Sequence, residues 1–127
     1  MCEHRSDEYE SLLKWKNIAE NSVKELEQLK NDVAVYRSHN ALFEKAINQW
    51  GRQSQIDMMI EECAELVKAL CKLKRKHDPS DTGALVNDIC EEIADVQLMV
   101  NQMKIVFGSK EVKDWYAVKV ERLQHLL

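Results

Sequence analysis

The chain of 127 residues has a formal net charge of −4 and contains only three glycines and one proline. A chain of this length most simply holds one modest core. The scarcity of Gly and Pro, with plentiful Leu, Glu, Lys and Ala, disfavours turn-rich all-β proteins and favours an all-α fold. The negative charge gives no general attraction to nucleic acid, and we interpret the short basic run at residues 72–77 as a helix C-terminal charge cluster.

Other function classes are disfavoured on equally simple grounds. No apolar stretch approaches the ~20 residues that span a bilayer, and no signal peptide is visible, so we expect a cytoplasmic protein without membrane partners. The four cysteines form no CxxC pair. Cys63, Cys71 and Cys90 lie at apolar helical positions, and we interpret them as small core residues in a reducing compartment rather than zinc ligands.

The N-terminal part of the chain carries an apolar heptad repeat. One seam position holds Leu12, Ala19, Leu26, Val33, Asn40 and Ile47, and the other holds Trp15, Ser22, Leu29, Tyr36, Phe43 and Trp50. The pattern predicts a long helix or a helical hairpin with a coiled-coil-like stripe. Asn40 fits either a polar residue that sets the register within one helix or a break between two helices.

Three further helices are predicted after Gly51, and no strand-like alternation appears. They cover about residues 54–76, 84–107 and 110–124. We interpret Ser54 as the N-cap of the first, with Asp57 three residues later as a weak capping box. The segment HDPSDTG, residues 77–83, holds the only proline and predicts a loop. Gly108 separates the last two helices.

Two of these helices carry the same acidic pattern, IEECAELVKAL at residues 60–70 and CEEIADVQLMV at residues 90–100. Helical periodicity places an apolar face on each. The first face is Met59, Cys63, Leu66, Val67 and Leu70, and the second is Ile89, Ile93, Val96, Val100 and Phe107. Glu62 and Glu92 fall at the edges of these faces. Glu65 and Asp95 lie further round, and Glu61 and Glu91 lie furthest.

If the two apolar faces pack together, the carboxylates of Glu62, Glu65, Glu92 and Asp95 converge. Four uncompensated carboxylates repel one another and raise one another's pKa values. An all-oxygen donor set suits a hard cation, so we expect Mg²⁺, with Mn²⁺ as a possible substitute. A di-iron bundle would carry Glu-x-x-His, and neither helix has a histidine there. One EExxE is common on helix surfaces, but two matching motifs on consecutive helices are far more specific.

The second acidic helix is apolar nearly all round. Leu98, Met99, Ile105 and Val106 lie off its main apolar face. Such a helix is expected to be buried from two sides, which one amphipathic neighbour does not provide. The sequence therefore predicts a homodimer or a larger assembly.

The stretches QWGRQSQIDMMIEECAELVKALCKLKR and EEIADVQLMVNQMKIVFG, with a closing KVERL, resemble the EExxE…ExxD signature of the MazG-like all-α nucleoside triphosphate pyrophosphohydrolases. The similarity is to the compact proteins of bacteria and phages, and it covers roughly residues 43–123. It implies a MazG-like four-helix bundle at residues 43–127, assembled as a homodimer or homotetramer. Residues 1–42 depart from the pattern as a coiled-coil-like helical extension, which fits an oligomerisation arm, a docking helix or a replacement for family elements.

The resemblance also implies a chemistry. These enzymes hydrolyse (deoxy)nucleoside triphosphates between the α and β phosphates, releasing the monophosphate and pyrophosphate by attack of a metal-activated water. The metal ligands would be Glu62, Glu65, Glu92 and Asp95, and Glu61 would be the first candidate for the catalytic base.

Several residues are candidates for substrate contact, and each also has a purely structural or solubility-related interpretation. Lys119 and Arg122 match a Lys/Arg pair of the compact relatives and would bind the phosphate tail, although terminal helices also carry such residues for solubility. Trp50 would stack on a base or, as a heptad-seam residue, join the core. Asn101 and Gln102 would reach a base edge or pair with backbone.

A rival function of another class is a helical protein-interaction or oligomerisation protein. In that reading the N-terminal arm binds the partner, and the MazG-like bundle is degenerate and inactive. The complete set of four predicted ligands favours the enzyme, because an inactive relic tends to lose at least one.

Overall fold

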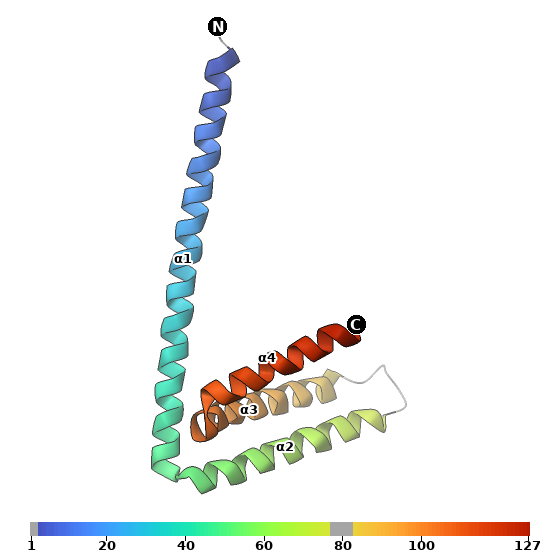
Figure 1. The fold of residues 1–127 in the computed structure, drawn as a ribbon. Helices are drawn as coiled ribbons and strands as arrows, with labels where there is room; N and C mark the ends of the chain where they lie inside the picture. The colour runs from blue at the N-terminus through green and yellow to red at the C-terminus, as the bar shows by residue number, and fades with distance from the viewer. Residues whose placement is uncertain (1–2, 77–82) are drawn as a thin grey trace. The chain divides into compact units, whose positions relative to one another are not determined.

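The computed structural model describes residues 3–76 and 83–127, and it describes side chains from residue 8 onward within those ranges. The described residues form four helices and no strand (Figure 1). Their bounds are α1 Glu3–Trp50, α2 Arg52–Lys74, α3 Gly83–Phe107 and α4 Ser109–Leu126. The all-α prediction is confirmed. The predicted loop lies, apart from Gly83, outside the described residues, and none of the described helices is long and apolar enough to cross a bilayer.

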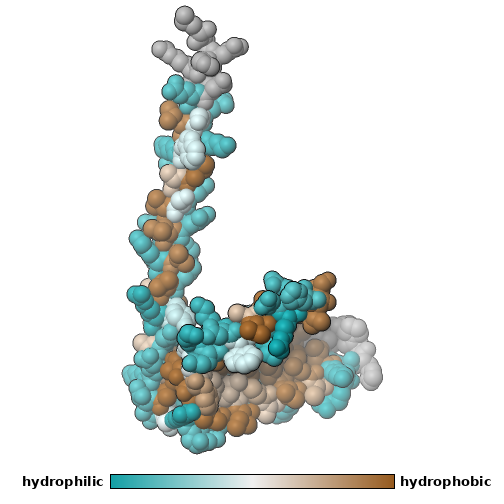
Figure 2. All heavy atoms as spheres, viewed as in Figure 1, coloured by the Kyte–Doolittle hydropathy of each residue, from teal (hydrophilic) through white to brown (hydrophobic). Residues whose placement is uncertain are grey.

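Contacts along the chain divide it into residues 1–39 and 40–127, and each unit is described by itself. The first unit is the N-terminal part of α1. The helix continues through Asn40 without a break, so the single-helix alternative is the correct one. All side chains of residues 8–39 are exposed, and Figure 2 shows hydrophobic side chains along this helix. Residues 8–39 therefore form no buried core among themselves.

The second unit contains a sharp change of direction at Gly51. Its backbone has φ 88° and ψ 151°, a conformation that is essentially restricted to glycine. The Gly51 N–H donates to the Ile47 carbonyl (2.9 Å), and the Gly51 carbonyl accepts from the Gln55 N–H (3.2 Å). One residue thus ends α1 and starts α2.

The predicted N-cap of α2 is wrong. The helix begins at Arg52, after Gly51, and has no side-chain cap, so Ser54 lies within the first turn. Asp57 instead accepts a hydrogen bond from Gln53 Nε2 (3.2 Å). The physical reason is the glycine turn, which starts the helix before a polar capping position is reached.

Helices α2 and α3 lie side by side and antiparallel, and their contact is the main packing of this unit (Figure 1). Each contributes a seam of buried or half-buried residues at alternating spacings of four and three. The seam is Gln55, Met59, Glu62, Leu66, Ala69 and Leu73 on α2, and Leu85, Ile89, Glu92, Val96, Met99 and Met103 on α3. This spacing keeps one stripe of each helix against the other.

The seam differs from the predicted apolar faces. Val67 and Leu70 are 60% and 46% exposed, whereas Glu62 occupies the middle of the α2 seam. Likewise Ile93 is 49% exposed, and the exposed Phe107 ring has the Arg52 guanidinium 4.8 Å from its centroid. A single helix pair buries only a narrow strip of each helix, so the wider apolar surface predicted for the core lies beside that strip.

The apolar surface beside the seam is open within the described part of residues 40–127. It consists of Ile60, Val67 and Leu70 on α2 and Val86 and Ile93 on α3.

The core interpretation of the cysteines is wrong for two of them, because Cys71 and Cys90 are exposed and only Cys63 is half-buried.

Helix α4 follows α3 across Gly108 and contacts it only sparsely. The Lys104 carbonyl accepts from the Gly108 N–H (2.9 Å) and from Ser109 Oγ (3.2 Å). No residue of α4 is buried.

Candidate functional site

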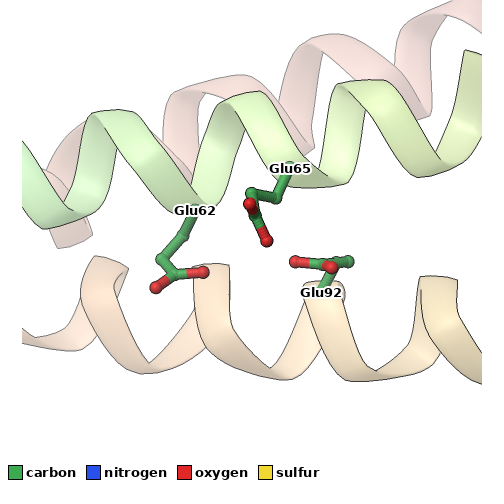
Figure 3. A group of neighbouring side chains, drawn as sticks. All are labelled: Glu62, Glu65 and Glu92. Carbon is green, nitrogen blue, oxygen red and sulfur yellow. The ribbon is translucent and has the colours of Figure 1, made fainter.

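The most distinctive feature of the α2–α3 pair is a group of three carboxylates between the helices. Glu62 and Glu65 come from α2, Glu92 comes from α3, and one oxygen of each lies within 4.8 Å of the others. All three side chains point into the space between the two helices (Figure 3). Glu62 and Glu92 are seam residues, so the same periodicity that packs the helices carries these acids inward.

The electrostatics of this cluster are unfavourable for its charged form. Partial burial raises the pKa of Glu62, and the nearby Asp95, Glu65, Glu92 and Glu61 raise it further. Partial burial also raises the pKa of Glu92, as do Glu65, Asp95 and Glu91, while Lys68 lowers it. Lys68 therefore offsets part of this repulsion at Glu92.

The other predicted acids surround this group without joining it at the same point. Asp95, one turn after Glu92, acts on both Glu62 and Glu92 and lines a cavity together with Glu62. Glu61 is exposed beside Glu62, and Glu91 is exposed beside Glu92. The predicted set of four therefore appears as three acids around one point and Asp95 facing the adjoining cavity.

The residues fit a hard divalent cation. Their donors are carboxylate oxygens alone, which Mg²⁺ and Mn²⁺ prefer over softer sites. Among the side chains that the structure describes, at residues 8–76 and 83–127, no donor forms a hydrogen bond or an ion pair with the Glu62, Glu65 and Glu92 carboxylates. The lone pairs of these carboxylates are therefore free to bind a cation. A bound cation would also offset the repulsion among the three acids.

A cavity of about 450 Å³ adjoins the acids. Its walls include the apolar side chains of Trp50, Met58 and Leu98, and Glu62 and Asp95 also line it. The volume and mostly apolar lining are typical of small-molecule sites. Trp50 is 60% exposed, so within this unit it forms part of the cavity wall rather than of a core.

One polar group in the cavity lacks a partner. Gln102 is only 4% exposed, and its Oε1 atom is buried without a hydrogen bond. Its Nε2 atom makes only a weak contact with Met99 Sδ (3.6 Å). A buried carbonyl left unpaired costs free energy, and a ligand N–H would satisfy it. Asn101 differs, because its Oδ1 atom already accepts from Lys104 Nζ (3.1 Å).

The predicted phosphate contacts lie elsewhere in the described chain. Lys119 and Arg122 are exposed on α4, and neither lines the cavity or pairs with an acid of the cluster. Sequence reasoning missed two nearer cations, Lys68 and Lys72. They line a smaller hollow of about 100 Å³ with Glu65 and Glu92. Their spacing of three and seven residues after Glu65 places them on its side of α2, and that signal was present in the sequence.

Comparison of the chain with protein-family models, curated proteins and solved structures finds no match in any of the three. The resemblance to MazG-like pyrophosphohydrolases stays a prediction from the two acidic motifs, and the function is argued from the site itself.

Proposed function

We propose that this protein is a divalent-cation-dependent hydrolase that converts (deoxy)nucleoside triphosphates into monophosphates and pyrophosphate. The observation that carries the proposal is the convergence of Glu62, Glu65 and Glu92 within 4.8 Å beside a nucleoside-sized cavity. A triphosphate is strongly anionic, and acids alone would repel it. A hard cation held by the acids would offset this repulsion, because carboxylate and phosphate oxygens are both ligands that such ions prefer.

Each acid has a defined part in the proposal. Glu62, Glu65 and Glu92 would hold the cation at the point where they converge, and Asp95 would be a further ligand from the adjoining cavity. When bound, the cation would offset the negative charge of the phosphates and polarise water. Glu61 is exposed beside Glu62 and supplies a base that does not share the point where the three acids meet. Its carboxylate accepts the proton of the attacking water.

The cavity supplies a place for the nucleoside. Its apolar wall suits a base, and the exposed Trp50 ring offers a stacking surface. The unpaired Gln102 Oε1 atom accepts a hydrogen bond, which favours bases that present an N–H donor. Lys68 and Lys72 line a hollow together with acids of the cluster, which Lys119 and Arg122 on α4 do not. Lys68 and Lys72 are therefore the first candidates for contact with the phosphate tail.

The open apolar surface beside the α2–α3 seam supports a homodimer or homotetramer. Ile60, Val67 and Ile93 are each about half exposed or more in the single chain. A patch of this kind commonly marks a protein interface. A second α2–α3 pair would cover it with the same surface, as two-fold assemblies do.

The test is release of pyrophosphate from a panel of nucleoside triphosphates with Mg²⁺. We expect pyrophosphate and monophosphate as the products, and Glu62→Gln and Asp95→Asn to lower kcat/KM at least ~100-fold, which corresponds to about 2.7 kcal/mol of transition-state stabilisation. The matched control is Glu121→Gln, the same change at an exposed site on α4, which should retain activity. Turnover of no nucleotide, or equal rates in all three variants, would overturn the proposal.

A further inference from the structure

The heptad seam of α1 within residues 12–36 is exposed in the unit of residues 1–39. Leu12, Leu26, Leu29 and Tyr36 are 63%, 54%, 60% and 64% exposed. Within the described part of residues 1–39, no other element packs on them. A lone helix obtains most of its stability in proteins from packing of its apolar face, so this seam requires an occupant.

The seam already has the shape that a second helix needs. Leu26, Leu29, Lys30 and Val33 line a hollow of about 380 Å³ on α1. They stand at spacings of three, four and seven residues, which outline a diamond on a helix surface. In coiled coils one side chain from the facing helix fills such a four-residue hole.

The residues that flank the seam indicate which helix fits. In a parallel, in-register pair, the residue before one seam position faces the partner residue five positions later. This rule pairs Glu25 with Lys30 of the other copy and Asp32 with Arg37. One heptad earlier it pairs two apolar residues, Ile18 and Val23. All three pairs are complementary.

The opposite orientation is disfavoured by the same residues. An antiparallel pair of identical helices places like flanks together, so Glu25 and Asp32 would meet acids while Lys30 and Arg37 would meet bases. Asp32 also accepts a hydrogen bond from Gln28 Nε2 within its own helix (2.8 Å). One of its oxygens is thereby held by Gln28, and the other remains for Arg37 of a second copy.

We propose that the occupant is a second copy of this chain, which pairs with α1 as a parallel, in-register coiled coil over residues 12–36. This interface is separate from the acid cluster and from the open surface of α2 and α3. It does not depend on nucleotide hydrolysis, so each proposal fails or survives on its own measurement.

The test is disulfide cross-linking in the full chain with its native cysteines replaced by alanine. Ser22→Cys places a thiol in the seam, where two copies of the same position meet within the reach of a disulfide. The matched control, Asn31→Cys, places a thiol on the opposite side of the helix. We expect at least ~10-fold more cross-linked dimer from Ser22→Cys, because pairing raises the effective concentration of the seam thiols. Equal cross-linking of both variants, or none, would overturn the proposal and point to an antiparallel pair or a different partner protein.

Charge reversal tests orientation and partner together. Lys30→Glu with Arg37→Glu, added to Ser22→Cys, sets acid against acid and should reduce cross-linking about five-fold or more. Adding Glu25→Lys with Asp32→Lys restores opposite charges and should restore the cross-link. The same charge changes can be made in the chain without Ser22→Cys and with its native cysteines. The concentration dependence of helix melting should then be lost with the first pair of changes and regained with the second, which tests pairing without added cysteines. Failure of the second pair to rescue the first would contradict parallel self-pairing.

Discussion

Replacement of Glu62 by glutamine should have opposite effects on stability with and without a divalent cation. In the metal-free chain, Glu62 lies with Glu65 and Glu92 in a group whose facing oxygens are within 4.8 Å. Two unit charges at that separation repel by about 1 kcal/mol in a water-like dielectric. Glu62→Gln removes the charge and keeps the shape, so we expect the free energy of unfolding to rise by about 1 kcal/mol.

A saturating cation should reverse this order. Ligand present at 100 times its Kd stabilises a folded protein by about 2.7 kcal/mol. The variant lacks one carboxylate donor, and each ten-fold loss of affinity removes about 1.4 kcal/mol of that stabilisation. The native chain should therefore be the more stable protein once Mg²⁺ is in large excess over its Kd.

Urea unfolding at one fixed chain concentration measures both effects, with the midpoint and slope recorded with and without Mg²⁺. Glu121→Gln on α4 is the control, and Mg²⁺ should stabilise it as much as the native chain. Destabilisation of the metal-free chain by Glu62→Gln, or equal stabilisation of that variant and the native protein by Mg²⁺, would show that Glu62 is not part of a repulsive, cation-binding group.

Three other outcomes follow from the same structure. The folded-state pKa values of Glu62 and Glu92 are raised above the ordinary 4.5, so the folded chain binds protons more tightly than the unfolded chain. The stability of the metal-free protein should therefore increase as the pH falls from 7 toward 4.5 and decrease as the pH rises. Thermal melts across that pH window check this. Gly51→Ala should lower the free energy of unfolding by about 1–3 kcal/mol because residue 51 has a positive φ, although no atom obstructs a Cβ there. The control Gly83→Ala, in the first turn of α3, should be neutral or slightly stabilising. Urea unfolding midpoints compare the two variants. Gln102→Met removes the unpaired buried carbonyl, so it should raise the free energy of unfolding by about 1 kcal/mol in the absence of nucleotide. The same variant should raise KM for the nucleotide about ten-fold. Unchanged values of both would refute the assigned contact.

Much of the fold follows from local sequence signals. The three helices after Gly51 begin and end within about three residues of the predicted limits, because Gly51, Gly108 and the proline-containing segment interrupt long helix-forming runs. The heptad repeat likewise predicted a helical N-terminal part. These signals depend on residues close together in the chain, and helices are the elements that such residues determine most directly.

Contacts between helices were harder to predict. The wide apolar surface of α2 did not reveal which stripe meets α3, and the seam runs through Glu62 and Ala69 rather than Val67 and Leu70. Hydrophobicity alone would have placed Glu62 outside the contact. The choice between stripes depends on how two helix surfaces fit together, which periodicity in one helix does not encode.

The candidate site shows the same division. The matched acidic motifs predicted that acids from two helices would meet, and Glu62, Glu65 and Glu92 do lie together. The cavity and the unpaired carbonyl of Gln102 were not predictable as such, because they arise from side chains of both helices. Lys68 was visible as a residue one turn from Glu65, but its proximity to Glu92 depends on the packing of α3.

The most direct measurement of the central claim is the position of Mn²⁺ in a crystal of the protein, located by its anomalous scattering. We expect an anomalous peak bonded to carboxylate oxygens of Glu62, Glu65 and Glu92, and its loss in Glu62→Gln. Absence of a peak at these acids with millimolar Mn²⁺ present, or a peak only at unrelated surface carboxylates, would contradict it.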